Sequence, residues 1–216
     1  MNVLNKFGML ILTASLLAAC GDSGNKGSSD KPAEQVAQSE SSSANKYEKA
    51  LSEFPEADPK LAEPIFISDK KSPEGLAELQ KFIHFTTSEE AQNIGKMGQE
   101  LQQLASQGKE AETLEQMKKL TDALEKFHQS ATALDIKDPE IKAVMDRTLQ
   151  VSSAANNLMI YAGKYSSELT IDGKDKDSLK FAKDFQEKSQ KLQETLRAAN
   201  QEVEKAATAL GKKYSQ

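Results

Sequence analysis

The placement of proline constrains this chain more than any other feature. Of its 6 prolines, the last two are Pro73 and Pro139, so the stretch from residue 73 to the end holds one proline after its first position. A proline inside a helix removes a backbone hydrogen bond and clashes with the preceding turn. Pro139 follows Asp138, a typical N-cap residue, and is suited to the first turn of a new helix. The sequence therefore permits long helices over residues 73–216.

Apolar residues in this stretch recur at alternating spacings of three and four. The predicted stripe over 110–134 is Thr113, Met117, Leu120, Leu124, Phe127, Ala131 and Leu134. The stripe after Pro139 is Ile141, Val144, Thr148, Val151, Ala155, Leu158, Ala162, Tyr165 and Leu169. The stripe after the turn at 172–174 is Ala182, Phe185, Ser189, Leu192, Leu196, Ala199, Val203, Ala206 and Leu210. This spacing is the seam of helices that cross at a small angle.

Boundary signals divide the stretch into four helices. We expect the first to begin at Ser72-Pro73-Glu74 with Ser72 as its cap, and to end near Gly108. A bend or break is predicted at residues 86–88, where Thr87 and Glu90 have the spacing of a capping box. Short connections favour antiparallel neighbours. The predicted fold class is all-α, an elongated antiparallel up-down four-helix bundle over 73–216; the alternative is a dimer of long coiled-coil hairpins.

Residues 46–72 form a separate predicted unit. Lys46 to Phe54 has the pattern of a short helix, and a proline-rich stretch follows that ends in Ile65-Phe66-Ile67. The prolines exclude a continuous helix. We expect this segment to lie extended across the bundle and to bury Phe66 together with one of the two isoleucines.

The first nineteen residues have the three parts of a secretory signal. Lys6 supplies a basic start, an apolar run follows, and Ala18 and Ala19 provide small residues before Cys20, the 1 cysteine of the chain. The run is about half of the ~20 residues that a spanning helix needs. The sequence therefore predicts a signal peptide over 1–19 that is cleaved between Ala19 and Cys20.

Leu17-Ala18-Ala19-Cys20 resembles the lipobox of bacterial lipoproteins. The resemblance implies a diacylglycerol on the Cys20 sulfur and a further acyl chain on its amine; two or three chains anchor a protein firmly. Gly21 follows the cysteine, and in Gram-negative lipoproteins an aspartate at that place favours the inner membrane. The resemblance therefore implies an outer-membrane location more than an inner one, given a Gram-negative source.

Residues 20–45 predict a lipidated N-terminus and a flexible linker, because they are small and polar with almost no large apolar residue. The net charge of −5 becomes −6 when cleavage removes Lys6, the one charge in residues 1–19. An acidic chain with no run of Lys or Arg is a poor candidate for binding nucleic acid or an anionic lipid surface. A single lipidated cysteine leaves no internal disulfide.

No catalytic motif emerges from the sequence, so we expect no enzymatic activity. His84 and His128 are far apart, and Glu125 to His128 is a single Glu-x-x-His where a di-iron bundle needs two. Met97, Met117, Met145 and Met159 are available as axial ligands for a non-covalent haem beside His128. Met in a helix is more often a packing residue. We predict no cofactor and no metal site.

The middle of the helix after Pro139 is rich in small and polar residues. Asn156, Asn157 and Gly163 lie there, and Gly95 and Gly98 lie on the first helix. Glycine inside a helix lowers its stability, so these residues indicate either close helix packing or a groove for a ligand or partner helix.

The resulting hypothesis is a membrane-anchored periplasmic or surface lipoprotein, a non-catalytic helical module that binds another envelope protein or peptide. The alternative is a helical bundle that binds a small ligand, a metal or haem.

Overall fold

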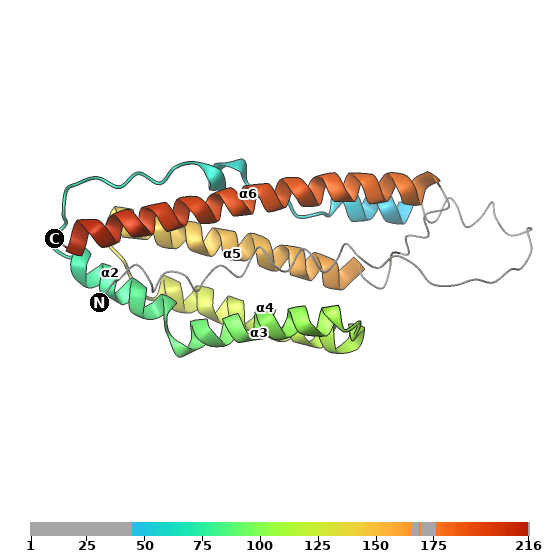
Figure 1. Cartoon of the computed structure of the whole chain (residues 1–216), viewed down its shortest axis with the longest axis horizontal. Helices are drawn as coiled ribbons and strands as arrows, with labels where there is room; N and C mark the ends of the chain where they lie inside the picture. The colour runs from blue at the N-terminus through green and yellow to red at the C-terminus, as the bar shows by residue number, and fades with distance from the viewer. Residues whose placement is uncertain (1–44, 166–168, 170–175, 216) are drawn as a thin grey trace, which may run out of the picture.

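A computed structural model describes residues 45–165, 169 and 176–215 (Figure 1). All regular structure in these ranges is helical, which confirms the all-α class. The signal peptide, Ala19, Cys20, nearly all of the predicted linker and the turn at 172–174 lie outside the described residues. The elements are a helix over residues 45–52, a short 3-10 helix η3 (Pro59–Ala62), α2 (Gly75–Thr86), α3 (Glu89–Ser106), α4 (Glu110–Thr132), α5 (Pro139–Tyr165) and α6 (Lys176–Ser215).

The predicted first helix is two helices, α2 and α3. The break falls where the sequence indicated, but the capping prediction is wrong by one residue. Ser88 is the extended N-cap of α3, and its hydroxyl accepts a hydrogen bond from the Ala91 N–H at 3.2 Å. Thr87 instead closes α2, because its hydroxyl donates to the Ile83 carbonyl at 2.8 Å. Gly108 follows α3 with a φ of 68°, a left-handed conformation in which glycine has no steric penalty.

The start of α2 differs from the prediction, whereas the start of α5 agrees with it. Helix α2 begins at Gly75, and its N-cap is Glu74, without a side-chain hydrogen bond. Ser72 does not cap α2, because its hydroxyl donates to the Asp138 carboxylate at 2.6 Å. Asp138 does cap α5, accepting from the N–H groups of Glu140 and Ile141 at 2.9 and 3.0 Å.

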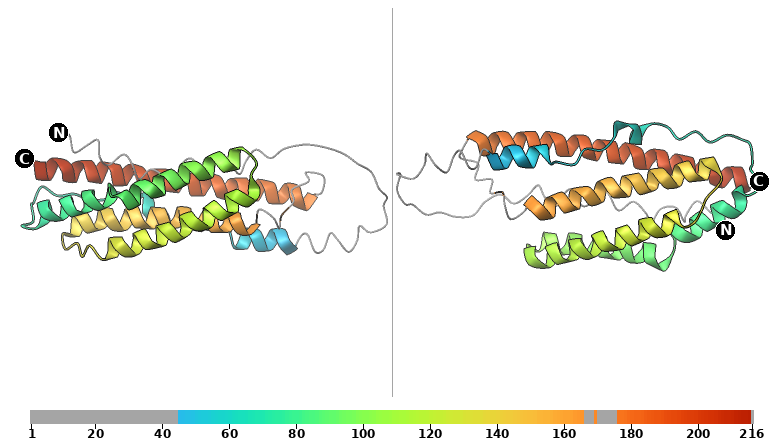
Figure 2. Two further views of the ribbon diagram at one scale, coloured as in Figure 1. Left: turned by 90° about the horizontal axis from the view of Figure 1, so that it is seen from below. Right: turned by 180° about the vertical axis from the view of Figure 1, so that it is seen from behind.

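The long helices pack in chain order. Helix α3 packs against α4, α4 against α5, and α5 against α6, while α2 contacts α5 and α6. Figures 1 and 2 show α5 between the α3–α4 pair and α6; α3, α4, α5 and α6 run in alternating directions, whereas α2 and α3 run in the same direction. At 40 residues, α6 is about 60 Å long and extends along the whole domain. The structure is helical as predicted but is not the predicted set of four helices, since the first one is split into α2 and α3 and a helix over 45–52 packs alongside.

Three hydrophobic clusters form the core, and α5 contributes to all of them. The first cluster joins residues 47–61 to the second half of α5 and the first half of α6. The second joins α2 to the start of α5 and the end of α6, and the third joins α3 and α4 to Met159. The predicted stripes supply part of this core: Leu120, Leu124, Phe127, Ile141, Val144, Leu192, Leu196 and Leu210 are all buried.

Phe66 contradicts the prediction, since its side chain is 81% exposed. Its neighbours Ile65 and Ile67 pack against the second cluster. Side chains alternate between the two sides of an extended chain. One side of this segment therefore faces the core with two isoleucines, and the intervening phenylalanine faces solvent.

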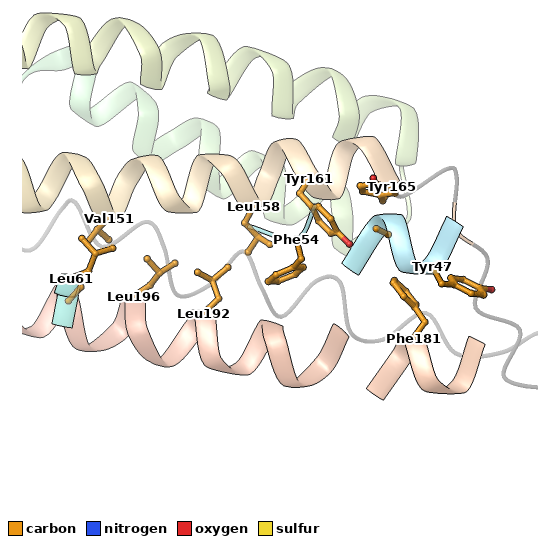
Figure 3. Close-up of a cluster of buried hydrophobic side chains, with 12 residues drawn as sticks. Tyr47, Phe54, Leu61, Val151, Leu158, Tyr161, Tyr165, Phe181, Leu192 and Leu196 are labelled. Atoms are coloured by element: carbon orange, nitrogen blue, oxygen red, sulfur yellow. The ribbon is translucent and has the colours of Figure 1, made fainter. Parts of the chain in front are cut away.

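Residues 45–62, called the strap below, lie along α5 and α6. Tyr47, Ala50, Phe54 and Leu61 of the strap are buried. Figure 3 shows Tyr47, Phe54 and Leu61 pointing toward side chains of the two helices. The predicted helix over 46–54 is confirmed in substance, with its regular part at 45–52.

Candidate functional site

Two of the five residues of the predicted groove, Asn156 and Gly163, lie at the interface between α4 and α5. Asn156 is buried, and its side-chain carbonyl accepts a hydrogen bond from Thr121 of α4 at 3.0 Å. Asn157 is exposed. A Cβ on Gly163 would lie 3.7 Å from Leu114 and Met117 of α4. Asn156 and Gly163 therefore share the α4–α5 interface, where they serve helix packing.

The two glycines of α3 are not part of that interface. Gly98 is buried. Gly95 is half-buried, and a Cβ there would meet nothing within 4 Å. The structure thus brings together two of the five predicted residues and places the others elsewhere.

The histidines lie in different surroundings. His84 is exposed, and His128 is half-buried with an Nε2 atom that is buried and has no hydrogen-bond partner among the described residues. Burial lowers the pKa of His128, because it disfavours the charged imidazolium. Met97, Met117 and Met159 belong to the third cluster and Met145 to the second. Within the described ranges, no group of three or more His, Cys, Asp or Glu side chains is placed to share a metal ion.

A polar junction joins α2, the α4–α5 connection and the end of α6. Its first member is Glu78 of α2, which is 5% exposed. The Glu78 carboxylate accepts hydrogen bonds from the Lys137 N–H at 2.9 and 3.0 Å and from the Asp138 N–H at 2.6 Å. A buried carboxylate is tolerated when such bonds compensate for its lost hydration. Glu78 therefore fixes α2 to the backbone just before α5.

Asp138 is the centre of the polar junction. Besides capping α5, its carboxylate accepts hydrogen bonds from Ser72 Oγ at 2.6 Å and from Tyr214 Oη at 3.0 Å. Burial acts to raise the pKa of Asp138, but the bonds from Ser72, Ile141, Tyr214 and Glu140 outweigh it and hold the pKa below its ordinary value. The carboxylate is thereby held ionised as a structural acceptor.

The polar junction ends in a buried ion pair. Lys213 Nζ lies 2.7 Å from a Glu140 oxygen, and its side chain is 5% exposed. Glu140 also accepts hydrogen bonds from the N–H and hydroxyl of Ser68. These contacts tie residues 68–72, α5 and α6 together, and the carboxylates of the junction are engaged in holding the fold.

A second polar set lies at the opposite end, on the strap. Glu53 forms an ion pair with Lys164, and Tyr165 Oη donates to Glu53 at 2.5 Å. The hydrogen bonds from Lys164 and Tyr165 lower the pKa of Glu53. Glu56 pairs with Lys188 of α6 at 2.8 Å. These pairs are solvent-exposed, so each contributes little stability and is weakened by salt.

Aromatic rings make up much of the first cluster. Tyr47 stacks on Phe181 with ring centroids 4.9 Å apart. Phe54 packs edge-on against Tyr161 at 5.1 Å and against Phe185 at 5.5 Å. Aromatic pairs of this geometry stabilise a contact beyond the area they bury. The strap therefore inserts the Phe54 ring between rings of α5 and α6 and stacks the Tyr47 ring on Phe181 of α6.

One hydroxyl group on α5 and one on α6 are buried without a hydrogen-bond partner among the described residues. Tyr161 Oη and Ser189 Oγ are buried and have no hydrogen bond within the described part of the chain. Burial raises the pKa of Tyr161 to about 12. Ser189 lies on α6 one turn after Phe185 and three residues before Leu192, on the same side of the helix as those two side chains. The sequence contained Ser189 within an apolar stripe, but Tyr161 lies beside its stripe and was not singled out.

Family comparison agrees with the signal at the N-terminus. Residues 76–215 match the family described as uncharacterised lipoprotein PM1805. No curated protein and no solved structure matched the chain. None of the described helices combines the length and the apolar character required to cross a bilayer. The chain therefore belongs to the PM1805 lipoprotein family, whose members are attached to a membrane by lipid.

Proposed function

We propose that this lipoprotein is a non-catalytic helical module that binds another protein of the bacterial envelope, most simply at the outer membrane. Cys20 carries the lipid, and residues 21–44 connect it to the helix over 45–52. A segment of about 24 residues spans roughly 25–30 Å on average if it behaves as a flexible chain. The domain can thus stand off the membrane while staying close to it.

The observation that carries the proposal is where the chain enters the domain. The strap begins at the end of the domain formed by the close of α5 and the start of α6, as Figure 1 shows. The polar junction and the end of α6 lie at the opposite end, about 60 Å away along α6. A lipid anchor, a spacer and a long rigid domain attached by one end suit a protein that presents helical faces to a partner.

In-cell photocrosslinking tests the proposal. A photoreactive residue is placed at exposed positions on α5, namely Asn157 and Ile160, and at the exposed Leu179 of α6. We expect discrete adducts with another envelope protein, and we expect them to weaken when Cys20→Ser removes the anchor. Adducts restricted to copies of the same chain, or none at any position, would contradict the proposal.

A further inference from the structure

We propose that the face of α5 and α6 now covered by the strap is the partner-binding site, and that the partner contributes an amphipathic segment that displaces the strap. This inference rests on the proposed function and names its site. The strap-binding face consists of Leu158, Tyr161 and Tyr165 of α5 and Phe181, Phe185 and Leu192 of α6.

The face already binds a segment of the proposed kind. The strap presents Tyr47 and Ala50 on one side of the short helix over 45–52 and Phe54 two residues past its end, at spacings of three and four. Laying the apolar side of an amphipathic helix between two others is a common mode of peptide recognition. The occupant in this structure therefore defines the chemistry of a competing one: two aromatic anchors seven residues apart.

Charge adds to that definition. Lys164 and Lys188 flank the face and pair with Glu53 and Glu56 of the strap. A partner segment that carries one acidic residue just before its second aromatic anchor and another two residues after it would meet the same two lysines. Because these pairs are exposed, they orient the segment more than they hold it.

The strap fits the face imperfectly. Tyr161 Oη, on a ring that contacts Phe54 of the strap, is buried and has no hydrogen-bond partner among the described residues. A buried hydroxyl that loses its water without gaining a hydrogen bond weakens the complex that buries it. An occupant with an acceptor at this hydroxyl, such as a carboxamide or a carboxylate, would bind the face more favourably than the strap does.

The strap also lies outside the part of the chain that defines the family. The match covers residues 76–215, which includes all of α5 and α6 and excludes the strap. Arg147 of α5 donates hydrogen bonds to the carbonyls of Leu61 and Glu63 at the end of the strap, and Ile65 and Ile67 beyond it pack on the second cluster. The strap can therefore leave α5 and α6 without dismantling the second or third cluster.

The test compares two variants of the full-length lipidated chain with the wild-type chain, all in detergent. Phe54→Asp places a charge in the first cluster and releases the strap, and Phe66→Asp makes the same change at an exposed site of the same segment. The probe is a fluorescein-labelled peptide with the sequence of residues 45–63, whose binding is followed by anisotropy. A probe that itself carries Phe54→Asp is the peptide control.

We expect saturable binding of the probe to the Phe54→Asp chain. Binding to the wild-type and Phe66→Asp chains should be at least tenfold weaker, because their own straps occupy the face. The control peptide should not bind. A third variant, Tyr161→Phe, added to the Phe54→Asp chain should bind the probe at least as tightly, since it removes a hydroxyl that the strap leaves unmatched.

Three results would overturn the inference. One is a Phe54→Asp chain that keeps slow amide exchange in α5 and α6 and yet does not bind the probe. Another is loss of slow exchange throughout α5 and α6 in that chain, which would make the strap a part of the core. The third is a wild-type chain that dimerises by exchanging straps, since the occupant would then be a second copy. Photocrosslinks to a partner from Asn157 with no probe binding would refute this site while leaving the proposed function standing.

Discussion

Replacing Asp138, a small side chain, should lower the free energy of unfolding by a large amount. Replacing it by alanine removes the cap of α5, which costs about 1 kcal/mol. It also takes the acceptor from the buried Tyr214 hydroxyl at 3.0 Å, and an unpaired buried hydroxyl costs about 1–3 kcal/mol. Ser72 Oγ lies 3.3 Å from Tyr214 Oη and offsets part of this loss. The expected destabilisation from Asp138→Ala is therefore about 2–3 kcal/mol.

The assay is urea unfolding followed by circular dichroism, on residues 20–216 with Cys20→Ser so that the chain is not acylated. Asp146→Ala is the matched control, since this carboxylate pairs with Lys142 at 3.0 Å on the surface and its loss should cost at most about 0.5 kcal/mol. Tyr214→Phe should destabilise the fold by about 1 kcal/mol, between the effects of Asp138→Ala and Asp146→Ala. Equal costs for Asp138→Ala and Asp146→Ala would refute the structural role assigned to the polar junction.

Two further predictions concern glycine and histidine, with the same unfolding assay. Gly75→Ala should lower the free energy of unfolding by about 1–3 kcal/mol, because the added Cβ would lie 1.9 Å from Tyr214 Oη. Gly95→Ala should raise it by up to about 1 kcal/mol, since a Cβ there meets nothing within 4 Å. A Gly75→Ala chain more stable than the Gly95→Ala chain would show that the packing around the two glycines is misassigned. Because burial lowers the pKa of His128, the folded chain binds fewer protons than the unfolded one at mildly acidic pH. The contribution of neutral His128 to the free energy of unfolding is therefore fully present above about pH 6.5, the ordinary pKa of histidine, and is lost as the pH falls through the lowered pKa of the folded chain. His128→Gln should flatten the dependence between pH 7.5 and 5.5, and an unchanged slope would count against this reasoning.

The helices from α4 onward could be predicted because their apolar spacing, caps and breakers agree. Leu120, Leu124 and Phe127 are buried where the stripe placed them, and Asp138 caps α5. Local patterns of this kind depend on neighbours within one or two turns.

The errors arose where distant residues decide the outcome. Ser72 has the local signature of a helix cap, but its hydroxyl donates a hydrogen bond to Asp138, 66 positions away. Phe66 is the largest apolar side chain of its segment, but the alternation of the extended chain gives the core side to Ile65 and Ile67. Neither contact has a signature within a single helix turn.

The candidate site was harder to predict than the fold. The small residues around Asn156 indicated close packing or a groove, and the structure places Asn156 in a hydrogen bond between α4 and α5. The burial of Tyr161 Oη without a partner among the described residues depends on the segment that packs against its ring, which is the strap. That segment is more than a hundred residues earlier in the chain, so no local pattern reveals the pairing.

Hydrogen exchange of the lipidated chain in its own membrane tests the central claim most directly. Amide exchange of residues 45–54 is compared between native envelope vesicles and protein-free liposomes of the same lipids. If a partner displaces the strap, these amides should exchange faster in the native vesicles while those of residues 158–165 stay at least as slow. Identical exchange at both segments in the two membranes would contradict the claim that this lipoprotein works by binding a partner on α5 and α6.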